Sequence, residues 1–343
     1  MKKITSALLL CLLAIFAAPK GATAQGPQKL IPINYGGPSA GYFTLYVADE
    51  LGLFKKHGLD PKFFWFNSGA PLLAALKSQS IDVITTGLAT VFALDQKIPL
   101  TIIFWELDNA QGEGLAVSSD SKVKSFKDLA QARAIGAATG TCGQVNVALI
   151  ARTLGIEYNS LNVVNLAPPL YANAFKGGAI DAALGWAPHS LMLENAGYKI
   201  INWDPDYGGV CPSVTSVRSD FLAKNPDVGY RLALVNKEVR EIIAKNPQLA
   251  IDSLKKTLSL SDDLAKKFYE KHCCGKLPSF EEQLSPTSPY SLTATDGGLT
   301  KQLFTAGEML HATGTIRNPL SMETIRKSID PSYIQKVVQD GKT

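Results

Sequence analysis

Two short segments of the chain have residues that could bind an anion without any formal positive charge. The first segment is Ser68, Gly69 and Ala70, and the second is Thr141, Cys142, Gly143 and Gln144. Each precedes a run typical of a helix, and a helix N-terminus presents unpaired N–H groups with partial positive charge. Because small residues let a ligand approach the backbone, these segments predict an oxyanion site formed by two helix N-termini. The alternative for each is a capped helix that binds no ligand.

Two aromatic residues and one histidine are candidates for contacts with the rest of a ligand. Trp186 ends an expected strand shortly before a proline, a position that core packing alone explains poorly. Tyr42 lies in the first loop, where it either contacts the ligand or fixes the following helix to the core. His189 either donates a hydrogen bond to an oxyanion or caps a helix.

A short sequence pattern, the repeated phrase, occurs twice among the elements that must position these residues. Residues 75–87 (ALKSQSIDVITTG) and residues 174–186 (AFKGGAIDAALGW) both have the pattern of a helix end, a tight turn and a buried strand. Ligands of open α/β sheets bind at the carboxyl ends of strands. Thr86 and Gly87 follow the first strand and Trp186 ends the second, so we expect two binding edges. The alternative is that such phrases simply recur in α/β proteins.

Strands and helices alternate from residue 31 to about residue 219, and the remainder is mostly helical. The first helix is expected over residues 39–58, where Phe43, Val47, Leu51 and Phe54 have helical spacing and Gly58 provides a stop. This alternation predicts the α/β class, with parallel sheets built from right-handed βαβ crossovers.

The N-terminal segment, residues 1–24, is typical of a secretory signal peptide. Lys2 and Lys3 precede a short apolar run and an A-x-A cleavage site at residues 22–24. Its removal takes away three lysines and no acid, which lowers the formal net charge from +4 to +1. With no basic block left, nucleic acid is not an expected partner. We therefore expect a protein of the periplasm that is soluble after cleavage.

No catalytic or metal-binding motif is found in the chain. G-x-S-x-G, H-E-x-x-H and P-loop patterns are absent. The run of His272, Cys273 and Cys274 is contiguous, and no second cluster completes a tetrahedral site. We therefore expect neither an enzyme nor a metal or other cofactor.

Several longer stretches resemble a known family of proteins. Residues 41–87, VVNLAPP at 163–169, AFKGGAIDAALGWAP at 174–188 and VRSDFLAKNPD at 217–227 occur in a familiar order and spacing. Together they resemble periplasmic solute-binding proteins of the nitrate, sulfonate and taurine ABC-transporter family, especially the taurine and alkanesulfonate branch. The resemblance covers nearly the whole chain after the signal peptide.

The resemblance implies a two-lobe periplasmic-binding-protein fold, a type II clamshell in which the chain crosses twice between lobes. Residues 28–112 plus 218–343 would form lobe 1, and residues 113–217 would form lobe 2. The implied protein is a monomer that captures a small sulfonate, taurine-like or related oxyanion for a membrane permease and its ATPase. The alternatives are a pyrimidine- or thiamine-precursor-binding protein or enzyme of the same fold, and a sensor that presents its solute.

A zwitterionic ligand such as taurine would also need an acid for its ammonium group. Glu106, Asp108 and Glu113 are the candidates, and the family's sequence around the first crossover favours Glu113. The alternative for Glu113 is a surface acid in a hinge. The segment GTCGQ differs from the hydroxyl- and aromatic-rich versions of taurine binders, which argues against taurine itself.

Four cysteines remain after signal cleavage, and export permits disulfides. Cys142, Cys211, Cys273 and Cys274 allow three sets of pairs. Cys142 and Cys211 both follow expected strands of lobe 2, in loops at the edge of the cleft. We therefore hypothesise a Cys142–Cys211 disulfide, with Cys273 and Cys274 either free or bonded to each other.

Overall fold

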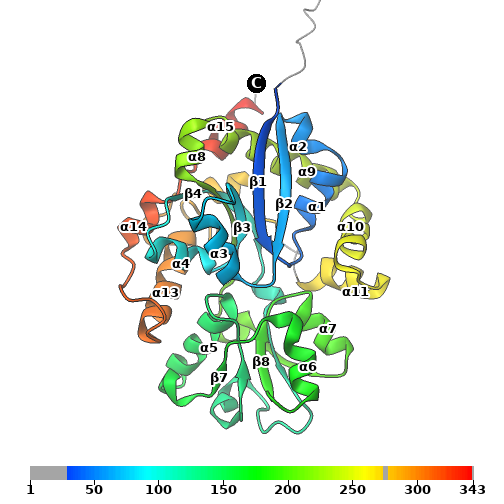
Figure 1. Cartoon of the computed structure of the whole chain (residues 1–343), viewed down its shortest axis with the longest axis vertical. Helices are drawn as coiled ribbons and strands as arrows, with labels where there is room; N and C mark the ends of the chain where they lie inside the picture. Colours follow the sequence, from blue (N-terminus) through cyan, green and yellow to red (C-terminus); the bar gives the residue numbers. More distant parts are fainter. Residues whose placement is uncertain (1–28, 273–276, 342–343) are drawn as a thin grey trace, which may run out of the picture.

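The computed structural model describes residues 29–272 and 277–341, which form two β-sheets, one above the other in Figure 1. The first sheet contains β1 (Ile31–Pro38), β2 (Leu59–Phe66), β3 (Val83–Thr86), β4 (Leu100–Asp108) and β10 (Pro212–Arg218). The second sheet contains β5 (Gly114–Val117), β6 (Ile135–Gly136), β7 (Val163–Val164), β8 (Ala182–Gly185) and β9 (Lys199–Trp203). The predicted signal peptide, Cys273 and Cys274 lie outside the described residues.

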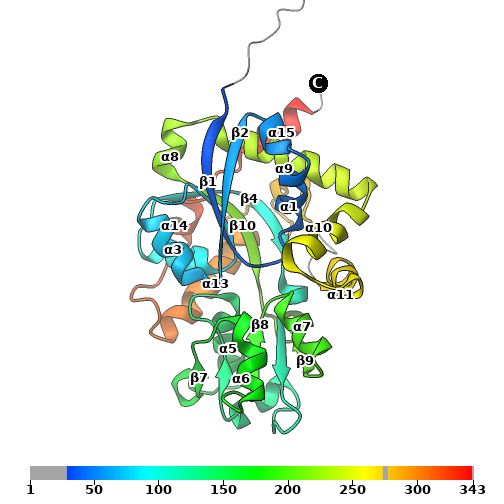
Figure 2. The same cartoon turned by 45° about the vertical axis from the view of Figure 1, so that its right-hand side comes forward.

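Helices surround both sheets (Figures 1 and 2). In the half that contains the first sheet they are α1 (Phe43–Glu50), α2 (Leu53–Lys56), α3 (Gly69–Lys77), α4 (Ala89–Asp95), α8 (Ser219–Lys224), α9 (Val228–Lys245), α10 (Gln248–Leu258), α11 (Asp262–Lys267), α12 (Phe280–Leu284), α13 (Gly298–Ala312), α14 (Met322–Lys327) and α15 (Ser332–Asp340). In the half that contains the second sheet they are α5 (Cys142–Thr153), α6 (Tyr171–Lys176) and α7 (His189–Asn195). Short 3₁₀ turns include η1 (Ala110–Gly112), η2 (Phe126–Gln131), η3 (Tyr158–Ser160), η4 (Pro168–Leu170) and η5 (Asp204–Tyr207), and η6 (Phe268–His272) is a π-helical turn.

The two sheets have the same topology. Their strand orders are β2-β1-β3-β10-β4 and β7-β6-β8-β5-β9. β3 and β8, the strands of the repeated phrase, hold the third position in each order, and all their residues are buried. The repeat predicted from the sequence therefore corresponds to equivalent strands of two similar sheets.

The prediction of parallel sheets is only partly right, because each sheet contains one strand that runs the other way. β10 is antiparallel to β3 and β4, and β5 is antiparallel to β8 and β9. Both strands enter their sheet directly from the other sheet, without a βαβ crossover. They therefore begin at the edge where the parallel strands end.

Two expected boundaries also differ from the structure. The helix expected over residues 39–58 is divided into α1 and α2, because Gly52 has a left-handed conformation (φ 67°) that interrupts the helix. β10 pairs with β3 and β4, so residues 212–217 belong to the first sheet and not to the second, where the sequence placed them. The lobe boundaries were set where the strand pattern ended, and β10 continues that pattern after the chain has already returned.

Among the described residues, no helix combines the length and the apolar character needed to cross a bilayer.

Candidate functional site

A cavity of about 30 Å³ lies where the two sheets meet. Its lining comes from both halves: Pro38, Ala40, Tyr42, Gly69, Thr86, Gly87, Leu88, Ala89, Asn109, Gly140, Thr141, Cys142, Trp186, Cys211 and Ser213. Among the described residues that line it, none is Asp, Glu, Lys, Arg or His. The cavity is therefore a small, largely apolar space with hydroxyl and amide groups but no formal charge.

Three helices begin at this cavity, since Gly69 starts α3, Ala89 starts α4 and Cys142 starts α5. The first N–H groups of a helix have no i→i−4 partner within the helix, so they can be available to a ligand. The N-cap side chains of Ser68 and Thr141 make no capping hydrogen bond to these groups, and the Thr141 hydroxyl instead donates to the Ala138 carbonyl at 2.7 Å. In α4 the Thr90 and Val91 N–H groups already donate to the Gly87 and Leu88 carbonyls at 3.1 and 3.0 Å. Helix N-termini from both halves therefore supply donors and positive partial charge to one space.

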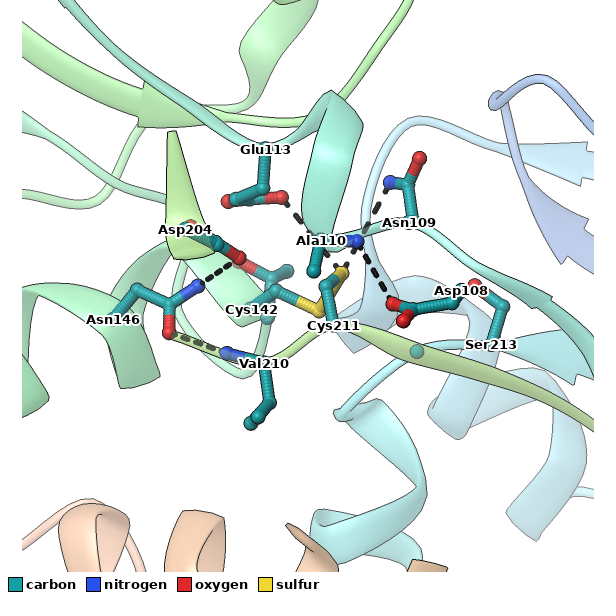
Figure 3. The surroundings of a disulfide bond; sticks show 12 residues. Asp108, Asn109, Ala110, Glu113, Cys142, Asn146, Asp204, Val210, Cys211 and Ser213 are labelled. Carbon is teal, nitrogen blue, oxygen red and sulfur yellow. Dashed lines mark hydrogen bonds between the residues drawn. A yellow bond between two sulfur atoms is a disulfide. The ribbon is translucent and has the colours of Figure 1, made fainter. Parts of the chain in front are cut away.

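A disulfide between Cys142 and Cys211 forms part of the cavity wall, which confirms the predicted pairing. Its Cα atoms are 5.5 Å apart, and it joins the N-terminus of α5 to the residue before β10 (Figure 3). A Cβ atom on Gly87 would lie 3.0 Å from the Cys142 sulfur, so the glycine allows the disulfide to pack against the end of β3. The disulfide thus fixes the helix terminus of one half beside the strand end of the other.

Contacts across the cavity hold the two halves together. The Trp186 indole N–H donates to the Ser39 carbonyl at 3.2 Å, which joins the end of β8 to the loop after β1. The Gln144 side chain donates to the Thr315 hydroxyl at 2.9 Å. Trp186 is 6% exposed, so its ring is enclosed between the halves while still lining the cavity.

Glu113 lies behind the disulfide and does not line the cavity. Its side chain is fully buried, and its Oε1 atom has no hydrogen-bond partner among the described residues. Oε2 lies 3.8 Å from the Cys211 sulfur (Figure 3), and a disulfide sulfur has no proton to donate. Burial raises the pKa of Glu113 to about 8, so the carboxyl is neutral at pH 7 and can direct its own proton to a neighbour.

One carboxylate oxygen and two sulfur atoms lie within 4.8 Å of one another, and they belong to Glu113, Cys142 and Cys211. Metal ions bind thiolates, and these sulfurs are bonded to each other. The disulfide form therefore offers a metal ion no thiolate ligand here.

The other two candidate acids have structural partners. Glu106 accepts hydrogen bonds from Thr44, from Thr215 at 3.0 Å and from Asn236 at 3.2 Å. Asp108 accepts a hydrogen bond from the Ala110 N–H at 3.0 Å. The structure therefore places no candidate acid at the cavity surface, where an ammonium group would need one.

The NMT1/THI5-like family model matches residues 40–250. The chain belongs to the NMT1/THI5-like family. A binding protein of Brucella abortus is 26% identical over 268 residues, covering 77% of this chain and 81% of the relative. An aliphatic sulfonates-binding protein of Bacillus subtilis is 27% identical over 239 residues, covering 68% and 72%.

The named relatives of this NMT1/THI5-like chain are binding proteins. The taurine-binding periplasmic protein of Escherichia coli is 26% identical over 200 residues, covering 57% of this chain and 61% of the relative. The solved structure of the periplasmic aliphatic sulphonate binding protein SsuA from E. coli is 17% identical, with a TM-score of 0.68, covering 89% and 99%. The predicted family resemblance and the predicted two-lobe fold class are confirmed.

The cavity brings together about half of the residues that the sequence indicated. Those at its surface are Tyr42, Gly69, Thr86, Gly87, Thr141, Cys142 and Trp186. The Tyr42 hydroxyl lies 3.4 Å from the hydroxyl of Ser213 on β10, which also lines the cavity.

The remaining indicated residues lie outside the lining, namely Ser68, Ala70, Glu113, Gly143, Gln144 and His189. Gly143 faces β8, where a Cβ atom would lie 2.7 Å from the Leu184 carbonyl, so it serves close packing of α5 on the sheet. The Gln144 side chain accepts from the Gly140 N–H at 2.9 Å. His189 starts α7, and burial lowers its pKa to about 4, so it is neutral at pH 7.

Sequence reasoning missed several lining residues, of which Asn109 and Ser213 carry polar side chains. Asn109 directly follows β4, and Ser213 is the second residue of β10, so both lie next to the paired residues Asp108 and Pro212. The chain passes between the two sheets at this point. The crossovers were predicted close to this point, so their polar residues were the available signal. Leu88 and Ala89 were missed because α4 was not recognised as a third helix N-terminus.

Proposed function

We propose that this protein is the extracytoplasmic solute-binding component of an ABC uptake system and captures a small sulfonate or related oxyanion. Convergence of three helix N-termini on one uncharged cavity carries the proposal. Such donors attract an anion without the desolvation cost of a buried lysine or arginine. The names of the relatives and the fold agree with this role, and a signal peptide at residues 1–24 would deliver the chain to the periplasm.

The composition of the cavity favours a ligand without an ammonium group. An ammonium ion enclosed in a small apolar space requires an acidic or multiple carbonyl partner. None of the described lining residues is acidic, whereas Tyr42 and Trp186 present aromatic surface. Alkanesulfonates therefore fit the composition of the cavity better than taurine.

A neutral heterocycle of the pyrimidine class is the second candidate. The observation in its favour is the same uncharged lining, in which Asn109 offers an amide and two aromatic rings flank the space. This ligand would make little use of three helix N-termini, which is why the oxyanion is preferred.

A ligand screen tests the proposal. Thermal unfolding is measured with ethanesulfonate, taurine, an aromatic sulfonate, nitrate, acetate and a pyrimidine, followed by calorimetry on any ligand that stabilises the protein. A ligand at about 100 times its Kd should stabilise the fold by about 2.7 kcal/mol. Binding only of pyrimidines or amines would contradict the oxyanion proposal.

Trp186→Ala tests the placement of the site. If the ring packs on the ligand, the substitution should weaken binding by roughly 1–3 kcal/mol. Trp65→Ala is the matched control, because Trp65 is 38% exposed on β2 and does not line the cavity. Equal affinities of the two variants would show that the ligand binds elsewhere.

In the proposed role the protein is a monomer that delivers its solute to a permease and its ATPase. No catalytic step is proposed, since capture needs only binding and release. A solute-presenting sensor would use the same cavity, and neighbouring genes for a permease and an ATPase would distinguish uptake from sensing.

A further inference from the structure

We propose that oxyanion binding by this protein is linked to a proton on Glu113, so that the anion binds tightly while Glu113 is neutral and weakly once it is ionised. The inference rests on the proposed oxyanion function. It assigns Glu113 a role as a positioning residue that acts through the electrostatics of the cavity without contacting the ligand.

The position of Glu113 carries the first part of the argument. Its carboxyl contacts the Cys211 sulfur at 3.8 Å on one side of a disulfide whose two cysteines line the cavity on the other. On the α5 side, Oε1 lies 3.3 Å from where a Cβ atom of Gly143 would be. The carboxyl is therefore separated from the cavity by one disulfide and lies beside the helix N-terminus that we propose binds the anion.

The part of the chain that the structure describes provides no positively charged partner for the Glu113 carboxyl. Burial, and then the charge of Glu113, raise the pKa values of Tyr171 on α6 and Asp204 on η5. The pKa of Tyr207 on η5 is raised by burial, by Asp204 and by Glu113. Cys142 on α5 and Cys211, which precedes β10, are bonded to each other. Among the described residues, no Lys, Arg or His makes an ion pair or hydrogen bond with its carboxyl. An ionised Glu113 would thus be a buried, unpaired charge.

Asp204 strengthens this effect. The backbone N–H of Asp204 donates to the Glu113 carbonyl at 3.2 Å, and burial raises the pKa values of both acids. Asp204 accepts hydrogen bonds from Asn146 at 2.7 Å and from Tyr207, whereas no N–H or O–H donor in the described part of the chain reaches Glu113. Burial, and then the charge of Glu113, raise the pKa of Asp204, so Asp204 keeps its proton when Glu113 ionises and the pair gains one negative charge, on Glu113.

Ionisation of Glu113 would place a negative charge close to a bound anion. Even at about 10 Å, two like charges in an effective dielectric constant of about 20 repel enough to weaken binding about tenfold. Because the pKa of Glu113 is about 8, the loss of affinity should begin near that pH. By linkage, the bound anion must in turn raise the affinity of Glu113 for its proton.

The test measures affinity for ethanesulfonate, and for nitrate as a second probe, by calorimetry from about pH 6 to about pH 9.5. Both probes keep a constant charge over this range, so a change in affinity reports on the protein. We expect the wild type to lose affinity about tenfold above its transition, and Glu113→Gln to keep one affinity throughout. Glu106→Gln is the matched control, a fully buried acid in the first sheet that should leave the wild-type pH profile unchanged.

A second measurement needs no variant. Calorimetry of the wild type near pH 8.5, in buffers of different ionisation enthalpy, should reveal uptake of a fraction of a proton on binding. A wild-type affinity that does not change with pH, or a Glu113→Gln protein that retains the loss, would overturn the inference alone. Failure of both probes to bind at every pH would overturn the proposed function and this inference together.

Discussion

Glu106 and Glu113 are both completely buried glutamates, seven positions apart in the chain, but their environments are opposite. Glu106 lies in the first sheet with hydrogen-bond donors from Thr44, Thr215 and Asn236, and the buried Arg240 lowers its pKa against the effect of burial. Glu113 lies at the crossover, where no N–H or O–H donor from residues 29–272 or 277–341 reaches its carboxyl. A buried carboxyl that accepts hydrogen bonds stabilises the core that surrounds it, whereas a buried carboxyl without donors is available for a change of protonation state.

The largest effect should come from removing the satisfied acid. Glu106→Ala leaves the Thr44, Thr215 and Asn236 side-chain donors without their acceptor, and it removes the negative charge that favours the charged form of the buried Arg240. Buried donors left without an acceptor cost about 1–3 kcal/mol each, so we expect a loss of about 3–5 kcal/mol of unfolding free energy. Urea denaturation at about pH 7 measures it, and a loss below about 1 kcal/mol would show that Glu106 is not part of the structural core.

The disulfide between Glu113 and the cavity provides a second test. Cys142→Ser/Cys211→Ser removes a crosslink over a sequence separation of 69 residues, which should cost about 2–4 kcal/mol of stability. The new hydroxyl groups can also donate hydrogen bonds to Glu113, which favours its ionised form and lowers its pKa. The pH at which ethanesulfonate affinity falls should therefore move down in this variant, and an unchanged midpoint would contradict the assignment of that transition to Glu113.

The unsatisfied acid should also give a distinct pH dependence of stability. Glu113 has an ordinary pKa of 4.5 when unfolded and about 8 when folded, so between these values the unfolded chain releases a proton that the folded chain retains. Its contribution to stability is complete below about pH 4.5 and is lost as pH rises toward 8, at about 1.4 kcal/mol per pH unit. Glu113→Gln should therefore gain stability relative to wild type between about pH 5 and about pH 8. A constant difference between the two proteins would contradict the raised pKa.

The sequence identified both glutamates as candidates and could not tell them apart. Their difference depends on Thr215 and Asn236, which lie more than 100 positions away from Glu106, and on the contact of Glu113 with Cys211. Local pattern carries no information on such long-range partners. The same limit explains why Asn109 and Ser213 were missed, since only the pairing of β4 with β10 brings them together.

Some features that depend on local pattern were predicted correctly. The two copies of the repeated phrase became β3 and β8 because helix end, turn and apolar strand are each written in a few consecutive residues. The Cys142–Cys211 pairing followed from placing two cysteines at one sheet edge, which needs only strand ends. Within the segment GTCGQ, however, pattern alone could not show that Cys142 faces the cavity while Gly143 faces β8.

The strand order of the first sheet also constrains the order in which the strands can pair when the chain is made. β4 borders only β10 in that sheet, and β10 begins at Pro212, after the whole second sheet has been completed at β9. A chain that emerges from its N-terminus therefore presents β4 with an empty edge until more than 100 further residues have followed. The second sheet, formed from one continuous stretch, can assemble first, and the first sheet is completed around it. β10 is thus the last strand of the first sheet to be made, and it takes the place between β3 and β4 that joins them into one sheet.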